Sequence, residues 1–479
     1  MLQEELRELI SSIQKMKTED GQIEIKQAEK GFPKIYDTLS SFSNQTGGGV
    51  ILFGIREKPY EIVGVYDAAD LMNKIQEQCL QMEPPIRAVC TATTITDKTV
   101  VSAEIPELPL TQRPCFYKGA GRLQGSYIRV GDGDLKMTPY EIYSYEAFKE
   151  KKQDELTTID KTSIANLRTP FLEEYRAKLA LSKPRFSMFS IEKTLTLQGF
   201  LLDQQATLAG IVLFADYPQF FFPRLCITAV VVPGKSMGDV SNTGARFIDN
   251  QTIEGTLPEM LEGALIFIRR NMKNETTINP ITGLRIDRTE YPLIAIREIL
   301  LNALIHRDYS IHTTSAPITV VMYTDRIEIE NPGGLYGRLT LDRLGIVSAD
   351  TRNPFIANAM EVAGATENRF SGIPTIRREM KLVQLPPPTF HNERGVFKVT
   401  LYNAAQVDSE VSERDELEKA ILQFCKQKRT REELALHFPN ISKIYLFSRY
   451  VNKLVDENLL ILGLPDKPRS KFQTFESVR

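Results

Sequence analysis

The chain has 479 residues, which is too many for one hydrophobic core and predicts about three or four domains. Hydrophobic residues make up 42% of the chain and charged residues 25%, so the composition is typical of globular proteins and excludes the disordered and fibrous classes. The formal net charge is -2, and a surface that binds nucleic acid must therefore be a local one.

Cysteine usage and hydropathy indicate the compartment. The five cysteines are dispersed without a C-x-x-C pair, which argues against a zinc site and against a disulfide framework. The N-terminal segment has the pattern of a charged amphipathic helix rather than of a signal peptide, and no run of about 18 apolar residues occurs. We therefore expect a cytoplasmic protein that makes no membrane contact.

The first 148 residues mix helical and strand patterns in the manner of an α+β domain. Residues 22–26 alternate apolar and polar side chains, which is the pattern of a half-buried strand. Gly47–Gly49 lies between a predicted helix and a predicted strand, so it is interpreted as a helix cap and tight turn rather than as a phosphate loop. Helices are predicted over 2–16, over 33–44 and from Thr138 onward, and strands over 22–26, 50–55 and 126–130.

Three motifs in this region carry a family resemblance. They are Glu24–Lys26, the glycine-containing segment Phe42–Ile55 and the string Tyr127–Gly131. Together they resemble the Schlafen/AlbA-like DNA-binding domain, which we assign to residues 1–148.

The same resemblance raises a nuclease hypothesis, because some members of that group are RNases that use a cluster of carboxylates. It assigns Glu19 and Glu24 to the first two acids and Glu57 to a third. Three carboxylates near a lysine could hold a divalent metal ion for phosphodiester hydrolysis. The alternative is that Glu24 and Lys26 form the solvated face of an alternating strand, which binds phosphates passively through Lys26.

Residues 149–284 are expected to form a mixed α/β connecting region. The apolar segments 209–214 and 225–232 are interpreted as a pair of buried strands, and a helix is predicted over 258–273. We expect this region to bridge the two halves of the chain and to contribute to dimerisation.

The following region carries polar residues at helical spacing. A predicted helix over 291–306 places Glu298 and Asn302 at i and i+4 on one face, with His306 one further turn along. A carboxylate at such a position can orient or deprotonate a water, and an amide oxygen can ligate Mg²⁺ between phosphates. Such a pair occurs by chance in many helices, so the segments that follow decide its interpretation.

Two glycine-containing segments follow that helix. A predicted hairpin over 318–330 leads into Glu330-Asn331-Pro332-Gly333-Gly334, where the glycines let the backbone approach a ligand closely. The side chains just before the glycines could accept a hydrogen bond from an adenine amino group. Ser371-Gly372-Ile373 then precedes a predicted helix over 375–380, and a helix N-terminus is a favourable phosphate site.

This order of elements resembles the GHKL (Bergerat) ATP-binding fold, and more closely its divergent branch described as helicase-related or as transcriptional regulators. The resemblance covers residues 285–403 and includes Asn302–Tyr309 and Arg352-Asn353-Pro354. It implies that Glu298 orients the attacking water and that ATP and Mg²⁺ are the cofactors, with Asn302 as the Mg²⁺ ligand. The cofactor-binding residues that it implies are Asn302, His306, Glu330, Asn331, Gly333, Gly334, Ser371, Gly372 and Ile373.

The chain also departs from the GHKL pattern. The aspartate of D-x-G-x-G has no single counterpart, because Glu330 and Asn331 compete for its position as the adenine reader. The second glycine element offers only Gly372. Three interpretations therefore stay open: nucleotide binding with hydrolysis, nucleotide binding without it, and a scaffold with an empty pocket.

The last part of the chain is expected to be a separate small unit. Residues 404–413 are polar and form a predicted linker, and residues 414–479 have the plan of a winged helix-turn-helix. Such a unit reads the major groove with its third helix, although winged helices also serve as dimerisation modules. The residues expected to contact DNA are Lys443, Tyr445, Arg449 and Lys453 on the third helix, Lys467, Arg469 and Lys471 on the wing, and Lys26 in the first domain.

The predicted architecture is an α+β multidomain protein: a Schlafen/AlbA-like domain, a mixed α/β middle region, a GHKL-like sandwich and a winged helix. The predicted function is that of a DNA-binding, transcription-regulatory protein that binds ATP, with RNA as a second candidate partner and a homo-oligomer as the expected assembly. Two alternatives stay open. One is an enzyme, either a nuclease at the N-terminal carboxylates or an ATPase at Glu298, and the other is a dimerising scaffold without nucleic-acid affinity.

Overall fold

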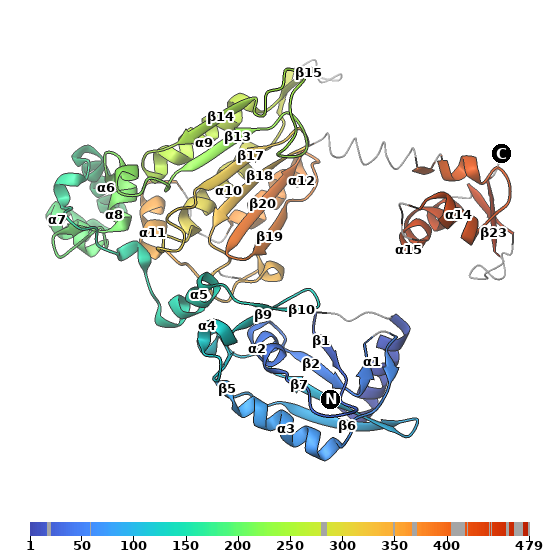
Figure 1. Cartoon of the computed structure of the whole chain (residues 1–479). Helices are drawn as coiled ribbons and strands as arrows, with labels where there is room; N and C mark the ends of the chain where they lie inside the picture. Colours follow the sequence, from blue (N-terminus) through green and yellow to red (C-terminus); the bar gives the residue numbers. More distant parts are fainter. Residues whose placement is uncertain are drawn as a thin grey trace.

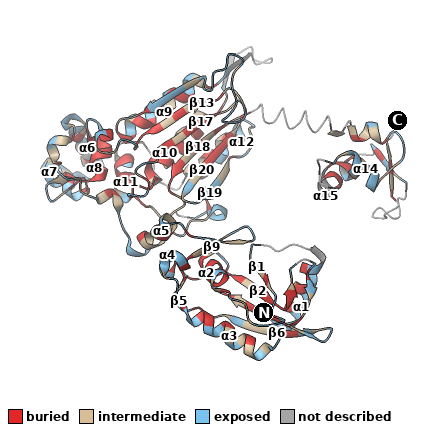
Figure 2. Cartoon of the chain, viewed as in Figure 1, coloured by how far each residue is buried: buried red, intermediate tan, exposed pale blue. Residues whose placement is uncertain are grey.

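The computed structural model describes residues 1–16, 21–57, 59–278, 285–347, 350–365, 371–403, 417–418, 420–439, 441, 443–456, 459–463 and 473–477. These residues form an N-terminal domain, a larger central unit and a C-terminal unit (Figure 1). In each part the buried side chains lie on the sheets and on the helices that cover them (Figure 2). Within the ranges described, no helix is long and apolar enough to cross a membrane.

The N-terminal domain is built on a four-stranded sheet. Its strands lie in the order β1 (Ile23–Lys26), β2 (Gly49–Phe53), β7 (Lys98–Ile105) and β6 (Val89–Ile95). β1 is parallel to β2, and the other neighbouring strands are antiparallel. The covering helices are α1 (Gln3–Met16), α2 (Tyr36–Asn44) and α3 (Ala68–Leu80).

The two faces of this sheet carry separate hydrophobic cores. Successive side chains of a strand point to opposite faces. Ile51 and Phe53 of β2 therefore pack with α2 and α3, whereas Leu52 between them packs with α1 on the other face. The smaller elements of the domain are β3 (Ile55–Arg56), β4 (Glu61–Ile62), β5 (Met82–Glu83), β8 (Phe116–Tyr117), α4 (Arg122–Gly125), β9 (Tyr127–Val130) and β10 (Gly133–Lys136).

Two predicted elements of this domain need correction. The helix predicted from residue 33 begins only at Tyr36, because Ile35 has a non-helical backbone (φ -127°) and its N–H donates to Gln78 Oε1 at 3.1 Å. The strand predicted over 50–55 is broken at Gly54, whose φ of +96° turns the chain between β2 and β3. α3 and the β6–β7 hairpin were not predicted.

The central unit contains a six-stranded sheet with helices packed against one face. The strand order is β14 (Asp249–Ile253), β13 (Ile227–Val231), β17 (Ile318–Met322), β18 (Arg326–Pro332), β20 (Val396–Tyr402) and β19 (Thr389–Glu393). Helices α9 (Leu257–Asn271), α10 (Leu293–His306) and α12 (Gly372–Leu382) cover the sheet (Figure 1). Their apolar side chains join those of β17 and β18 in one core.

This sheet unites two regions that the sequence divided at residue 284. β13 pairs in parallel with β17, so Ile227 lies opposite Ile318 and both belong to the same core. The predicted division therefore falls inside a single unit.

The segment 209–214 is also not a strand but part of α8 (Leu208–Phe214). The Thr207 side chain caps this helix by accepting from the Gly210 N–H, and every residue of the helix is buried. A short run that is apolar on all sides fits a buried helix as well as a buried strand, which explains the wrong prediction. The other elements are α6 (Thr169–Ser182), α7 (Ile191–Leu197), β11 (Leu201–Leu202), β12 (Gln205–Ala206), β15 (Asn274–Ile278), β16 (Arg285–Thr289) and α11 (Pro354–Val362).

A helix and a buried acid connect the N-terminal domain to the central unit. The helix predicted from Thr138 is confirmed as α5 (Pro139–Glu150), with a capping box between Thr138 and Glu141. Beyond it, the fully buried Glu155 accepts the backbone N–H groups of Phe355 and Ile356 at 3.0 and 2.8 Å, which ties this segment to the start of α11. Burial raises the pKa of Glu155 to about 7, although both N–H donors act to lower it.

The C-terminal unit has its own small core. A three-stranded sheet in the order β21 (Arg429–Thr430), β23 (Thr474–Ser477) and β22 (Leu460–Leu462) packs with the helical segments α14 (Arg431–His437), α15 (Lys443–Leu446) and α16 (Asn452–Asp456). Thr430 and Glu433 form a capping box at the start of α14. The predicted linker 404–413 lies outside the described residues.

Candidate functional site

A cavity of about 780 Å³ opens in the central unit between α10, α12 and the strands β18 and β20. The elements that the sequence singled out as an acid/amide helix, a glycine turn and a glycine at a helix start all contribute to its wall. Asn302 lines the cavity from the acid/amide helix, Asn331 lines it just before the glycine turn, and Gly372 lines it at the helix start. The tertiary structure thus brings together segments that are separated along the chain.

Part of the cavity wall lies where the start of α12 approaches α10. Glu298, Asn302 and His306 line the cavity from successive turns of α10. A Cβ atom added to Gly372 would lie 3.0 Å from Asn302 Nδ2 and 3.2 Å from Glu298 Oε2. A side chain here would crowd the ends of the Asn302 and Glu298 side chains, so the glycine lets the first turn of α12 lie close to the acid and the amide.

Another part of the wall is formed by β18, whose side chains alternate. Ile329 and Asn331 face the cavity, and Asn331 is only 5% exposed. Its Oδ1 has no hydrogen-bond partner among the described residues. A buried amide oxygen without a partner costs about 1–3 kcal/mol, so a donor supplied by a ligand would stabilise this position.

Glu330 does not belong to this wall. Period-two alternation directs it to the opposite face of the sheet, where its side chain is 42% exposed and lies 3.7 Å from Lys398 Nζ. Of the two residues that competed for the adenine-reading position, only Asn331 faces the cavity.

The glycine turn after β18 brings its backbone against the end of α10. Gly333 has a φ of +110°, and its N–H donates to the Gly395 carbonyl oxygen at 2.7 Å. An added Cβ would meet Asp308 Cβ at 2.7 Å, so this position requires glycine. Gly333 and Gly334 both line the cavity, as do Ser371 and Ile373 at the start of α12.

Arg352 and His306 contribute to the electrostatics of the wall, alongside Glu298, Arg297, Asp350 and Arg378. The Arg352 guanidinium is buried beside Asp308, with which it forms an ion pair. Burial, together with the neighbouring Arg352, lowers the pKa of His306 to about 4. The imidazole is therefore neutral at pH 7 and adds no charge to the cavity.

Several lining residues were not singled out in the sequence. Phe397 and Val399 reach the cavity from β20, and Tyr336 and Arg378 also contribute. The alternation of β20 offered a signal for Phe397 and Val399, since residues two apart share a face. The placement of Arg378 depends on how α12 is oriented against α10, for which no local pattern exists.

Glu24, the second acid of the nuclease hypothesis, forms ion pairs with neighbouring cations. Glu24 pairs with Lys26 and lies 2.8 Å from Arg129, which also contacts Asp134 at 2.9 Å. Glu57 is exposed, and Glu19 lies outside the described residues. In the described part of the chain, no group of three or more His, Cys, Asp or Glu side chains is placed to hold a metal ion.

Most of the predicted DNA contacts in the C-terminal unit fall where the side chains are not described. Lys443 is exposed at the start of α15. Tyr445, Arg449 and Lys453 lie in the helical stretch that follows, and nothing is described of their side chains. The wing residues Lys467, Arg469 and Lys471 lie outside the described residues.

Two parts of the chain match known protein families. Residues 19–138 match the family described as "Schlafen, AlbA_2". Residues 315–401 match HATPase_c_4, described as "Putative ATP-dependent DNA helicase recG C-terminal". The second range contains β17, β18, α11, α12, β19 and all of β20 except its last residue, and thus much of the cavity wall.

Two solved structures are similar to the chain. The DIP2311 protein from Corynebacterium diphtheriae is 19% identical over 99% of this chain and 97% of its own length, with a TM-score of 0.40. The N-terminal domain of a RecG-related protein from Nitrosomonas europaea is 24% identical over 27% of this chain and 92% of its own length, with a TM-score of 0.22. Likeness at this level supports no inference about function. No curated protein matches the chain significantly.

The lowered pKa of His306 makes a testable prediction. The chain has four histidines, so the His306 imidazole can be assigned in NMR spectra by comparison with a His306→Gln variant. We expect its signals to stay those of a neutral ring down to about pH 5, because burial and Arg352 oppose protonation. Since the folded pKa lies below the ordinary value of 6.5, His306 contributes stability above pH 6.5 that is lost as the pH falls through 4. A midpoint near 6.5 would contradict this environment.

Proposed function

This chain carries a Schlafen AlbA_2 domain followed by an ATPase-type domain of the recG C-terminal family, and we propose that it is a DNA-binding regulator of transcription that binds ATP. ATP occupies the cavity of the central unit, while the N-terminal domain and the C-terminal unit contact DNA. One observation carries the nucleotide part of the proposal: the buried Asn331 amide oxygen faces the cavity without a partner among the described residues.

The adenine is proposed to bind beside Asn331 in the cavity. The amide oxygen can accept a hydrogen bond from the exocyclic amino group of adenine. Ile329, Phe397 and Val399 provide apolar walls that suit a flat heterocycle. The glycine turn at Gly333 lets the backbone come close to the ring without a side chain between them.

The phosphates are proposed to bind beside Gly372, at the start of α12. The N–H groups and the dipole of a helix N-terminus favour an anion, and Gly372 adds no side chain of its own at this turn. Arg297 and Arg378 line the same cavity and would add positive charge. Asn302 would ligate a Mg²⁺ ion shared with the phosphates, which would neutralise part of their charge.

Replacing Asn331 with alanine is expected to weaken ATP binding about tenfold, which corresponds to about 1.4 kcal/mol for one hydrogen bond. Isothermal titration of the full-length chain with Mg²⁺ and a non-hydrolysable ATP analogue measures the effect. Glu330→Ala is the matched control, because Glu330 neighbours Asn331 on β18 but faces the other side of the sheet. Equal losses in both variants, or no binding by the wild type, would refute the assignment.

ATP hydrolysis is a second candidate function, favoured by the position of Glu298 beside Asn302 and Gly372. A carboxylate there can accept the proton of a water that attacks the terminal phosphate. We expect Glu298→Ala to lower phosphate release about 100-fold while ATP binding is retained, since general-base catalysis contributes about 10²–10⁴-fold. A wild-type chain that binds ATP but releases no phosphate would mean binding without turnover.

The nucleic-acid part of the proposal is supported by the AlbA_2 match and by the sheet-and-helix plan of the C-terminal unit. Lys26 contributes less than its sequence position suggested, because Glu24 neutralises its charge. Lys443 is exposed, as a phosphate contact requires. We therefore propose that the C-terminal unit supplies most of the DNA affinity and the N-terminal domain a second contact.

Retention of duplex DNA should fall with salt and should largely disappear in a chain that ends at residue 410. Lys and Arg contacts to phosphates release counterions, so affinity should drop by about 10-fold or more between 50 and 200 mM salt. Fluorescence anisotropy with labelled DNA, and with RNA of the same sequence, measures both effects. Undiminished binding by the shortened chain would assign the main DNA contact to the N-terminal domain. No binding by the full-length chain at low salt would exclude DNA as the partner.

A further inference from the structure

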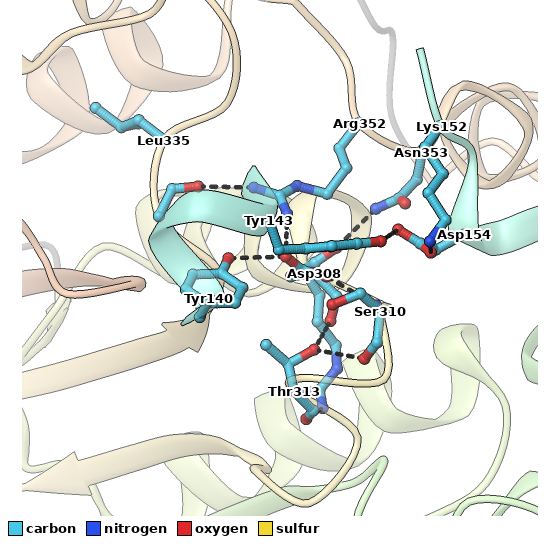
Figure 3. Close-up of polar contacts among 12 residues, drawn as sticks. Tyr140, Tyr143, Lys152, Asp154, Asp308, Ser310, Thr313, Leu335, Arg352 and Asn353 are labelled. Carbon is cyan, nitrogen blue, oxygen red and sulfur yellow. Dashed lines mark hydrogen bonds and ion pairs between the residues drawn. The ribbon is translucent and has the colours of Figure 1, made fainter. Parts of the chain in front are cut away.

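The carboxylate of Asp308 is fully buried and is shared by three segments of the chain (Figure 3). Its Oδ2 accepts the Tyr140 hydroxyl at 2.7 Å and pairs with the Arg352 guanidinium, and its Oδ1 accepts the Ser310 N–H at 2.7 Å. A buried carboxylate is strongly unfavourable unless such partners are all in place. The positions of Tyr140 and Arg352 are therefore mutually dependent.

Arg352 connects this carboxylate to the wall of the cavity. Its guanidinium donates to the Gly334 carbonyl oxygen at 3.4 Å and lies over the Tyr336 ring, 4.8 Å from the centroid. Arg352, Gly334 and Tyr336 all line the cavity. A ligand held against this part of the wall would therefore contact Arg352, Gly334 or Tyr336.

Tyr140 connects the same carboxylate to the N-terminal domain. It lies in the first turn of α5, directly after the AlbA_2 match ends at residue 138. Glu146 of α5 forms an ion pair with Arg122 of α4, which attaches the helix to the domain. Near the other end of α5, Phe148 packs edge-on against Tyr336 with ring centroids 5.5 Å apart. α5 thus connects to the cavity wall in two ways. Tyr140 acts through Asp308 and its partner Arg352, and Phe148 packs directly on Tyr336.

We infer that α5 transmits occupancy of the cavity to the N-terminal domain, with Tyr140 as the positioning residue that acts through Asp308 and Arg352. This inference rests on the proposed nucleotide binding and names its regulation. A nucleotide packed against Arg352 and Tyr336 restricts both side chains, which holds Asp308 and Tyr140 in place and stabilises the docked helix. By linkage, a nucleic acid that favours the docked helix tightens nucleotide binding by the same factor.

Two variants of α5 separate this route from a general effect on the helix. Tyr140→Phe removes one hydroxyl and keeps the ring that packs on Gly395 and lies 6.1 Å from the His312 ring. Tyr143→Phe removes a hydroxyl from the same helix, but that hydroxyl donates to Asp154 at 2.6 Å and not to Asp308. Both variants retain the aromatic packing, and their melting temperatures check that the fold is intact.

Hydrogen–deuterium exchange of the full-length chain tests the inference. Peptides that cover residues 139–150 are compared with and without Mg²⁺ and a non-hydrolysable ATP analogue, and calorimetry on the same samples reports binding. We expect the analogue to slow exchange in α5 about fivefold in the wild type and in Tyr143→Phe, as one added net hydrogen bond would. In Tyr140→Phe the analogue should still bind, but exchange should change less than about twofold.

The outcomes distinguish the inference from the function on which it rests. Analogue binding without slower exchange of α5 in the wild type overturns the inference and leaves the nucleotide site standing. A response of Tyr140→Phe equal to that of the wild type also overturns it. If the wild type binds no analogue at all, nucleotide binding and the inference fail together. Loss of the response in Tyr140→Phe alone supports the route through Asp308.

Discussion

The buried carboxylate of Asp308 is the constraint on which the arrangement of the central unit depends. Its charge is compensated by Arg352, by the Tyr140 hydroxyl and by a backbone N–H. Moving Arg352 would leave the carboxylate unpaired in a region with little access to water, at a cost of several kcal/mol. Moving the hydroxyl or the N–H would remove a buried hydrogen bond, at a cost of about 1–3 kcal/mol. The end of α10, the segment before α11 and the first turn of α5 are consequently held at one point. That point lies directly behind the glycine turn of the cavity, because Gly333 packs against Asp308.

The chemistry of the cavity follows from two simple geometric rules. Helical spacing places Glu298 and Asn302 on one face of α10, and the absence of a side chain at Gly372 lets α12 begin beside them. Strand alternation turns Asn331 into the cavity and Glu330 away from it. The cavity wall therefore combines a polar part beside the start of α12 with an unpartnered amide and apolar side chains from β18 and β20. This combination suits a ligand with an anionic part and a flat, hydrogen-bonding part.

In the N-terminal domain, ion pairs change the role that the sequence predicted for Glu24. Glu24 has the position of a metal-binding acid in the Schlafen/AlbA resemblance, yet Lys26 and Arg129 compensate its charge. Arg129 is nearly fully buried and also contacts Asp134. A metal ion at Glu24 would have to compete with two resident cations. The arrangement therefore favours a structural role for this acid over a catalytic one.

Patterns formed by residues close together in the chain determined much of this protein. The Thr-Pro start of α5, the Glu298–Asn302 spacing and the glycines beside the cavity depend on neighbouring residues, and each was found from the sequence. Tertiary structure alone decided that β13 and β17 share one sheet and that the all-apolar segment 209–214 is a helix. It also joined Tyr140 to Asp308, which are 168 residues apart. No local pattern encodes such a contact, because it arises only when independently formed elements pack and a buried charge selects its partners.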